Sequence, residues 1–333
     1  MKSKKRNAAS AALAFLLLTA LPVTAFAQEL TVGGQIVGIQ ISTDGVMVAG
    51  VGPVETAEGS RSPAEEAGVK EGDLVKAING TPVTGASALI AAVGALNGEP
   101  ARLTLLRGKR ELEVEIQPVL STQQQWMLGL WLRDGVTGIG TVTFCDPVTG
   151  IFGALGHGVS DEGGGRALPM SDGHITEAEI LDVIPGTAGA PGELSGCTDV
   201  GRVLGRVEKN TDHGVYGHML TPPVGRVVQT GEMDLGPAII LSTVSGRETR
   251  EYRAAVSRLY RDSGGKHAMI TITDSELCSV TGGIVQGMSG SPILQNGKLV
   301  GAVTHVFVND PTRGYAISIQ DMLDDAGITE KAA

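Results

Sequence analysis

Residues 282–293 read GGIVQGMSGSPI and are followed by an Asn296-Gly297 turn signal between two apolar runs. Glycines on both sides of Ser289 let the backbone turn sharply, which exposes the hydroxyl and points consecutive N–H groups at one spot. An acyl-transfer nucleophile with an oxyanion hole needs that arrangement. The passage therefore predicts a nucleophilic Ser289 on a loop before a strand hairpin. A glycine- and serine-rich loop without chemistry is the alternative, and Ser291 is a competing hydroxyl.

A second glycine-rich passage lies upstream, where residues 152–161 read FGALGHGVSD. A buried structural imidazole usually has bulky apolar neighbours, whereas Gly156 and Gly158 leave the ring of His157 open to approach by another loop. A general base needs such access. His157 is therefore the predicted base, and a hydrogen-bonded turn histidine is the alternative. For the acid that would orient the imidazole, the residues alone allow Asp199 or Asp212, which lie between base and nucleophile in the chain.

The composition agrees with a soluble, β-rich protein of about two domains. The chain has 333 residues, of which 42% are hydrophobic and 19% charged, and this balance is that of ordinary globular proteins. The 48 glycines and only 3% aromatic residues favour short strands and tight turns over long helices. A net charge of −10, with no long Lys/Arg cluster after residue 6, argues against nucleic acid as a partner.

Residues 1–27 have the features of a secretory signal: a basic start, an apolar run and a small-residue end reading AFA. We expect cleavage and export, with no later segment long and apolar enough to span a membrane. Without cleavage, residues 8–27 would act as an anchor. The three cysteines form no CxxC pair, so they predict no zinc site and at most one disulfide. They are Cys145, Cys197 and Cys278.

The segment 30–118 predicts short strands around two helices. Ser62 and Pro63 are helix-start signals and Gly68 a stop signal, a second helix is expected over 86–96, and alternating runs at 102–106 and 112–116 predict a hairpin. The motifs SPAEEAG (62–68), GD (72–73) and ING (78–80) resemble the signature of bacterial PDZ domains. That resemblance implies a peptide-binding strand edge.

The peptide-binding edge would be a Gly-Φ-x-Φ strand, and Gly38-Ile39-Gln40-Ile41 matches that pattern. The preceding Gly33-Gly34 pair would let the loop curl around a terminal carboxylate. Gly38 as a simple chain turn is the alternative. The ligand of this edge could also be a segment of the protein itself.

The segment 122–330 is rich in strands and turns until an amphipathic helix over 318–326, which predicts a β-barrel domain closed by a helix. Taken whole, the chain resembles the stage IV sporulation protein B peptidases. The matching runs are residues 138–144, 153–157, 185–193, 282–292 and 301–311. The implied fold is mainly β, with an N-terminal PDZ domain followed by a chymotrypsin-like double β-barrel serine peptidase domain.

The resemblance also implies roles for single residues. Ser289 and His157 would be nucleophile and base, and the acidic residue on the segment TITD (271–274) would make Asp274 the third member of a triad. The serine loop resembles the Gly-x-Ser-Gly-x-Pro loop of chymotrypsin-like proteases, which implies that the N–H groups of Gly287 and Ser289 form the oxyanion hole. No metal or organic cofactor is expected.

The implied function is signalling proteolysis between the mother-cell and forespore membranes. The protease would cleave the extracytoplasmic part of a membrane-bound regulator, and itself, and so release processing of a late sigma factor. Two other hypotheses are a secreted PDZ scaffold with a non-catalytic peptidase-like domain and a quality-control protease of the HtrA type. In the HtrA type, the PDZ modules follow the protease domain, which is the reverse of the order here.

Overall fold

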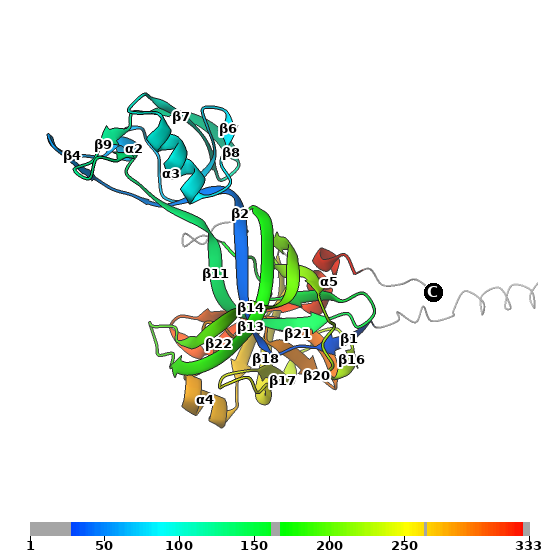
Figure 1. The fold of residues 1–333 in the computed structure, drawn as a ribbon. Coiled ribbons are helices and arrows are strands. Elements are labelled where there is room, and N and C mark those ends of the chain that lie inside the picture. The colour runs from blue at the N-terminus through cyan, green and yellow to red at the C-terminus, as the bar shows by residue number, and fades with distance from the viewer. Residues whose placement is uncertain (1–27, 161–166, 263–264, 329–333) are drawn as a thin grey trace, which may run out of the picture.

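The computed structural model describes residues 28–160, 167–262 and 265–328. Its strands form two barrels that lie together and a smaller unit that stands apart from them, above the barrels in Figure 1. The proposed signal segment, residues 1–27, lies outside the described residues. Within the described ranges, no helix has both the length and the apolar character needed to cross a membrane.

The N-terminal barrel is a ring of six antiparallel strands. β2 pairs with both β11 and β13, and the remaining pairings connect β11 to β13 through β12, β15 and β14. The strands are β2 (Ile36–Val51), β11 (Leu130–Cys145), β12 (Ile151–Ala154), β13 (Met170–Ile184), β14 (Glu193–Thr211) and β15 (Gly214–Met219). Apolar side chains such as Val37, Val142 and Phe152 fill this barrel. β1 (Glu29–Val32) and β16 (Val227–Gln229) extend the sheet from β11.

The C-terminal barrel is closed and continuous in the chain. Its strands are β17 (Gly236–Ser242), β18 (Arg250–Asp262), β19 (Gly265–Ile272), β20 (Pro292–Gln295), β21 (Lys298–Phe307) and β22 (Asp310–Ser318). α4 (Ser275–Thr281) interrupts it between β19 and β20. The predicted closing helix is confirmed as α5 (Ile319–Ala326), whose buried Met322 and Leu323 share one cluster with Phe144 of the N-terminal barrel and Ile317 of the C-terminal barrel. Helix α5 therefore helps to hold the two barrels together.

The unit that stands apart has the predicted PDZ elements. The predicted hairpin is confirmed as β7 and β8, and the two helices as α2 and α3. The bounds are β3 (Val54–Thr56), β4 (Gly59–Arg61), α2 (Pro63–Glu66), β5 (Leu74–Ile78), β6 (Thr81–Pro82), α3 (Ala86–Ala95), β7 (Ala101–Arg107), β8 (Arg110–Ile116), β9 (Val119–Leu120) and β10 (Trp126–Met127). The GD motif has a structural role: the fully buried Asp73 accepts hydrogen bonds from Arg107 Nε at 2.6 Å and Nη2 at 2.7 Å.

The predicted peptide-binding edge is wrong. Residues 38–41 lie in the middle of the N-terminal barrel, where Gly38 pairs with Ile139 on one side and Thr176 on the other. Both edges of this stretch are therefore occupied, and no strand can be added there. The N–H groups of Gly33 and Gly34 are also used, since they donate to barrel carbonyls at 2.9 Å and 2.8 Å. Sequence alone could not reveal this, because the pairing partners follow about a hundred residues later.

Two long strands connect the PDZ unit to the barrel. β2 and β11 pair with each other from Val51 and Leu130 at the PDZ end to Ile36 and Thr141 in the barrel, with register shifts on the way. Figure 1 shows both strands running between the two bodies. The first half of β2, although it lies in the predicted PDZ segment 30–118, thus belongs to the barrel. The PDZ unit is inserted between two neighbouring strands of the N-terminal barrel.

Candidate active site

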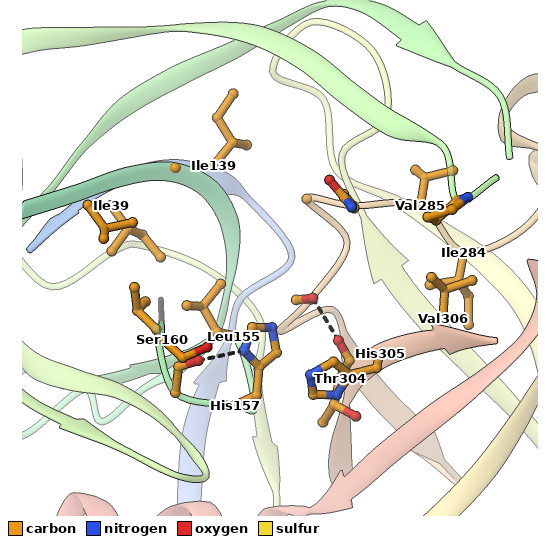
Figure 2. A pocket seen from close by; sticks show the side chains of 18 of the residues that line it. Ile39, Ile139, Leu155, His157, Ser160, Ile284, Val285, Thr304, His305 and Val306 are labelled. Atoms are coloured by element: carbon orange, nitrogen blue, oxygen red, sulfur yellow. Dashed lines mark hydrogen bonds between the residues drawn. The ribbon is translucent and has the colours of Figure 1, made fainter. Parts of the chain in front are cut away.

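A cleft of about 860 Å³ lies between the two barrels. Ile39 and Ile139 of the N-terminal barrel line it together with His157, and the C-terminal barrel contributes Ser289 and His305. Figure 2 shows His157 and His305 side by side in this cleft, with apolar side chains on either side of them. The structure therefore brings the predicted nucleophile and base to one site from loops of different barrels.

Glycine makes the serine loop possible at two positions. Gly287 has φ +97° and Gly290 has φ +94°, and a Cβ on Gly290 would lie 2.1 Å from the carbonyl oxygen of Thr141. Only glycine fits a backbone that turns this way so close to a neighbour. The loop is fixed to β11 of the other barrel: Thr141 N donates to Ser289 O at 3.0 Å, and Thr141 Oγ1 donates to Gly287 O at 2.9 Å. The N-terminal barrel thus holds the loop that carries the serine.

Some backbone N–H groups of this loop donate to carbonyl oxygens of the protein, and others have no acceptor among the described residues. Met288 N donates to Val285 O at 3.1 Å, and Gly290 N donates to Val303 O at 2.8 Å. Within the described part of the chain, the N–H groups of Gly287 and Ser289 have no such acceptor. These are the two donors that the resemblance to chymotrypsin-like proteases implies for an oxyanion hole, and the fold leaves them available for a ligand.

The hydroxyls of Ser289 and Ser291 have different surroundings. Ser289 is half-buried at the cleft, and its Oγ donates to the carbonyl oxygen of Thr304 at 2.7 Å. Ser291 is fully buried, and its Oγ donates to Ser242 Oγ at 3.1 Å inside the C-terminal barrel. Only Ser289 is placed where a substrate could reach it.

His157 follows β12 on a turn with two positive φ angles, +72° at Leu155 and +69° at Gly156. Its Nδ1 lies 2.9 Å from Gly158 O. A carbonyl can only accept, so Nδ1 carries the proton of the neutral ring and Nε2 has the free lone pair. Burial lowers the pKa of His157 below its ordinary value, so the ring is neutral at neutral pH. In this part of the structure no hydrogen bond joins His157 to Ser289.

Comparisons with known proteins place this site in a family. The family model described as SpoIVB peptidase S55 matches residues 124–323, and a PDZ domain model matches residues 56–107. The chain belongs to the SpoIVB peptidase S55 family. It is a serine endopeptidase with an N-terminal PDZ domain. No curated protein gives a match.

Solved structures of other proteases show more distant likeness to this S55 peptidase. The inactive form of the Rv3671c protease is 16% identical over 57% of this chain and 84% of its own, with a TM-score of 0.33. An HtrA-type protease, AlgW with a decapeptide, is 12% identical over 59% and 53%, with a TM-score of 0.34. The thermostable serine protease AL20 from an extremophilic microorganism is 11% identical over 58% and 92%, with a TM-score of 0.33.

The structure does not bring Asp274 to the histidine of this peptidase. Asp274 is the N-cap of α4: its Oδ1 accepts from the N–H groups of Glu276 at 3.0 Å and Leu277 at 3.2 Å. Its Oδ2 accepts from the backbone N–H of Arg253 at 3.2 Å. The carboxylate is thus used in fixing a helix on the C-terminal barrel, and Asp274 does not line the cleft. The family-based prediction that Asp274 orients His157 is wrong in this structure.

The two aspartates that the residues alone allowed differ in position. Asp199 Oδ1 accepts from the N–H of Gly201 in its own strand at 3.0 Å. Asp212 lies in the turn between β14 and β15 and lines the cleft, and its carbonyl oxygen accepts from Gly158 N at 3.3 Å. Asp212 is the one carboxylate among the described residues that line the cleft. Its side chain is exposed and makes no hydrogen bond to His157 in the described structure.

A second histidine, which the sequence analysis gave no role, also faces the site. The ring centroids of His305 and His157 are 4.5 Å apart, with 32° between the planes. Partial burial of the ring in the cleft and the neighbouring His157 lower the pKa of His305 to about 4, while the residue keeps an exposed face. The signal in the sequence was the run GAVTHVFVNDP (301–311), whose match to the family includes this histidine.

The remaining walls of the cleft are mostly apolar. Ile284, Val285 and Val306 form one end of it, close to His305 (Figure 2). In the described ranges, no group of three or more His, Cys, Asp or Glu side chains is placed to hold a metal ion. Cys145, Cys197 and Cys278 are all free, so none of them forms the disulfide that the sequence allowed.

Proposed function

We propose that this S55 peptidase is a signalling protease that cleaves an extracytoplasmic segment of a membrane-bound regulator, and itself, by acyl transfer to Ser289. The observation that carries the proposal is the convergence of Ser289, His157 and two available N–H groups on one cleft between the barrels. The family match supports the role in sporulation, where cleavage would trigger processing of a late sigma factor. Export to the space between the mother-cell and forespore membranes is part of the proposal.

The proposed reaction begins when His157 Nε2 takes the proton of Ser289 as Oγ attacks the peptide carbonyl. The developing oxyanion accepts hydrogen bonds from Gly287 N and Ser289 N. Collapse of the intermediate breaks the C–N bond, and His157 returns the proton to the leaving amine. Water then repeats the steps to release the acid. Throughout, Gly158 O holds Nδ1–H, which leaves Nε2 as the nitrogen that exchanges the proton.

Substrate selection would have two parts. The apolar end formed by Ile284, Val285 and Val306 fits a small aliphatic side chain beside the scissile bond, because a charged group would lose its hydration there. The PDZ domain would hold a second segment of the substrate or of a partner protein, as PDZ domains bind extended peptides. Its groove is not the stretch 38–41.

The deciding experiment is incubation of the purified chain beside its Ser289→Ala variant, followed by mass analysis for self-cleavage. A fluorophosphonate should label Ser289 in the wild type, and a library of peptides with varied side chains should show preference for small aliphatic residues. Cleavage by the wild type alone supports the proposal. A folded wild type that neither reacts with the probe nor cleaves any peptide would favour the alternative, a non-catalytic PDZ scaffold.

A further inference from the structure

The dipeptide Thr304-His305 contacts both members of the proposed catalytic pair. Thr304 O accepts the hydrogen bond of Ser289 Oγ at 2.7 Å, and the His305 ring packs on His157 with centroids 4.5 Å apart. This geometry depends on an irregularity of β21: its register against β22 shifts between Val303 and Val306. Such shifts turn a side chain away from the regular alternation of a strand. Here the turned side chain is His305, and it enters the cleft (Figure 2).

The His157 ring has few other supports. One edge is held by Gly158 O through Nδ1. In the part of the chain that the structure describes, no carboxylate is hydrogen-bonded to this ring, because Asp274 caps α4 and Asp212 contributes only its backbone oxygen to the neighbouring residue. The second support that the structure provides is therefore the face of His305. We propose that His305 is a positioning residue, whose uncharged ring holds His157 by stacking and shields it from water.

The electrostatics of the cleft agree with an uncharged His305. Its pKa of about 4 means that it carries no proton at neutral pH, so the proton taken from Ser289 stays on His157. The titratable groups on the described walls of the cleft are His157 after β12, Asp212 in the β14–β15 turn and His305 on β21. The serine loop contributes none. Stacking also removes water from one face of His157, and this burial lowers the pKa of the base.

The test compares His305→Phe, which keeps a flat ring but cannot titrate, with His305→Ala, which removes the ring. His267→Ala is the matched control, since His267 also stacks on a ring, that of Tyr260 at 5.6 Å, and does not line the active-site cleft. The first measurement is an NMR titration of His157 in the Ser289→Ala background. It needs no turnover, so it reports on positioning even if the proposed function fails. The inference itself rests on the proposed role of His157 as base.

We expect the titration midpoint of His157 to rise towards about 6.5 in His305→Ala and to stay low in His305→Phe and in the control. With an active Ser289 and a small ester substrate, His305→Ala should lose about tenfold or more in kcat with KM nearly unchanged, because the base is no longer held in line. His305→Phe should keep kcat within about threefold, because the stacked face remains. An unchanged midpoint and kcat in His305→Ala would overturn the proposal. So would an equal loss in His305→Phe.

Discussion

The two barrels are built from the chain in different ways. The C-terminal barrel uses one continuous stretch from β17 to β22, whereas the N-terminal barrel begins with β2, is interrupted by the PDZ domain and resumes with β11. The serine loop belongs to the continuous barrel and His157 to the interrupted one. The difference means that only the barrel of His157 shares strands, β2 and β11, with the PDZ domain.

The two halves are nevertheless joined at the site itself. Thr141 of β11 makes two hydrogen bonds to the serine loop, and His305 of β21 stacks on His157. Each barrel therefore fixes the functional residue of the other. A disturbance of β2 or β11 should therefore reach Ser289 as well as His157.

The largest effect is expected from removal of either functional side chain. Ser289→Ala and His157→Ala should each lower kcat by about 10⁴-fold or more, and the double variant should be little worse, because the two groups act in one proton transfer. The rate of peptide cleavage, measured under single-turnover conditions, gives the loss in each variant. Losses that multiply in the double variant would mean that the two barrels contribute independently.

A large effect on folding is expected from Gly38→Trp. A Cβ at Gly38 would lie 2.5 Å from Thr198 Cγ2 and 2.6 Å from Thr176 Oγ1, so an indole must push β2 away from β13 and β14. Overpacking of this kind costs roughly 3 kcal/mol or more. We expect fluorophosphonate labelling of Ser289 and self-processing to fall together, with a lower melting temperature.

The control for this variant is Gly94→Trp in the PDZ helix α3, where an added Cβ meets no atom within 4 Å. It should fold and label normally. If Gly38→Trp labels normally and loses only self-processing, the strand has the free edge that the sequence analysis predicted, and the barrel pairing is contradicted.

The sequence was sufficient for the local features of this molecule. Glycine-flanked Ser289 and His157, the GD and ING motifs and the closing helix are all defined by neighbours in the chain, so their elements and even the available N–H groups could be anticipated. What failed was non-local. Gly38 looks like a PDZ edge because its partners, Ile139 and Thr176, are about 100 to 140 residues away. The closure of a barrel depends on which strands pair, and the residue pattern of a single strand does not show its partners.

The role predicted for Asp274 was wrong, and the role of His305 was missed, for a related reason. The segment TITD ends a strand and begins a helix, and Asp is a favoured N-cap residue, so its local role was readable but was outweighed by the family resemblance. His305 enters the cleft only because β21 changes register after Val303, which no pattern of residues announces. Asp212 remained an open alternative, and only the fold places it on the cleft.

A smaller effect is expected from the aspartates. The one on the C-terminal barrel should affect stability, and the one on the N-terminal barrel should affect turnover. Asp274→Ala should lower the free energy of unfolding by about 1 kcal/mol through loss of the α4 cap, with kcat changed less than about twofold. Asp212→Asn should leave stability unchanged and lower kcat by about tenfold or less, because an exposed charge stabilises the imidazolium only weakly. Thermal melts and ester turnover test both. Loss of turnover in a folded Asp274→Ala protein would restore the assignment that the family resemblance implies.

A still smaller effect is expected from pH between 6.5 and 8. His157 must be neutral to accept the proton, and burial lowers its pKa below the ordinary 6.5. More than half of the base is then neutral at pH 6.5, so kcat/KM should change by less than about twofold up to pH 8. A midpoint above 7 in the pH profile of kcat/KM would show that a carboxylate raises the pKa of His157 by more than burial lowers it.

The smallest effect is expected in the pH dependence of stability, measured in Ser289→Ala to prevent self-cleavage. The pKa of His305 is about 4 in the folded protein and about 6.5 in the unfolded chain, so below pH 6.5 the unfolded chain binds more protons. The stabilisation is thus complete above pH 6.5 and is lost as the pH falls from 6.5 towards 4. His305 keeps an exposed face, so solvent screens this contribution. His305→Phe in the same background removes it, and the melting temperature should fall only about a degree less between pH 6.5 and 4.5. Carboxylates titrate in both proteins, so the difference between the two curves isolates the histidine that the C-terminal barrel places against the base of the N-terminal barrel. Parallel curves would mean that His305 is no more buried in solution than in the unfolded chain.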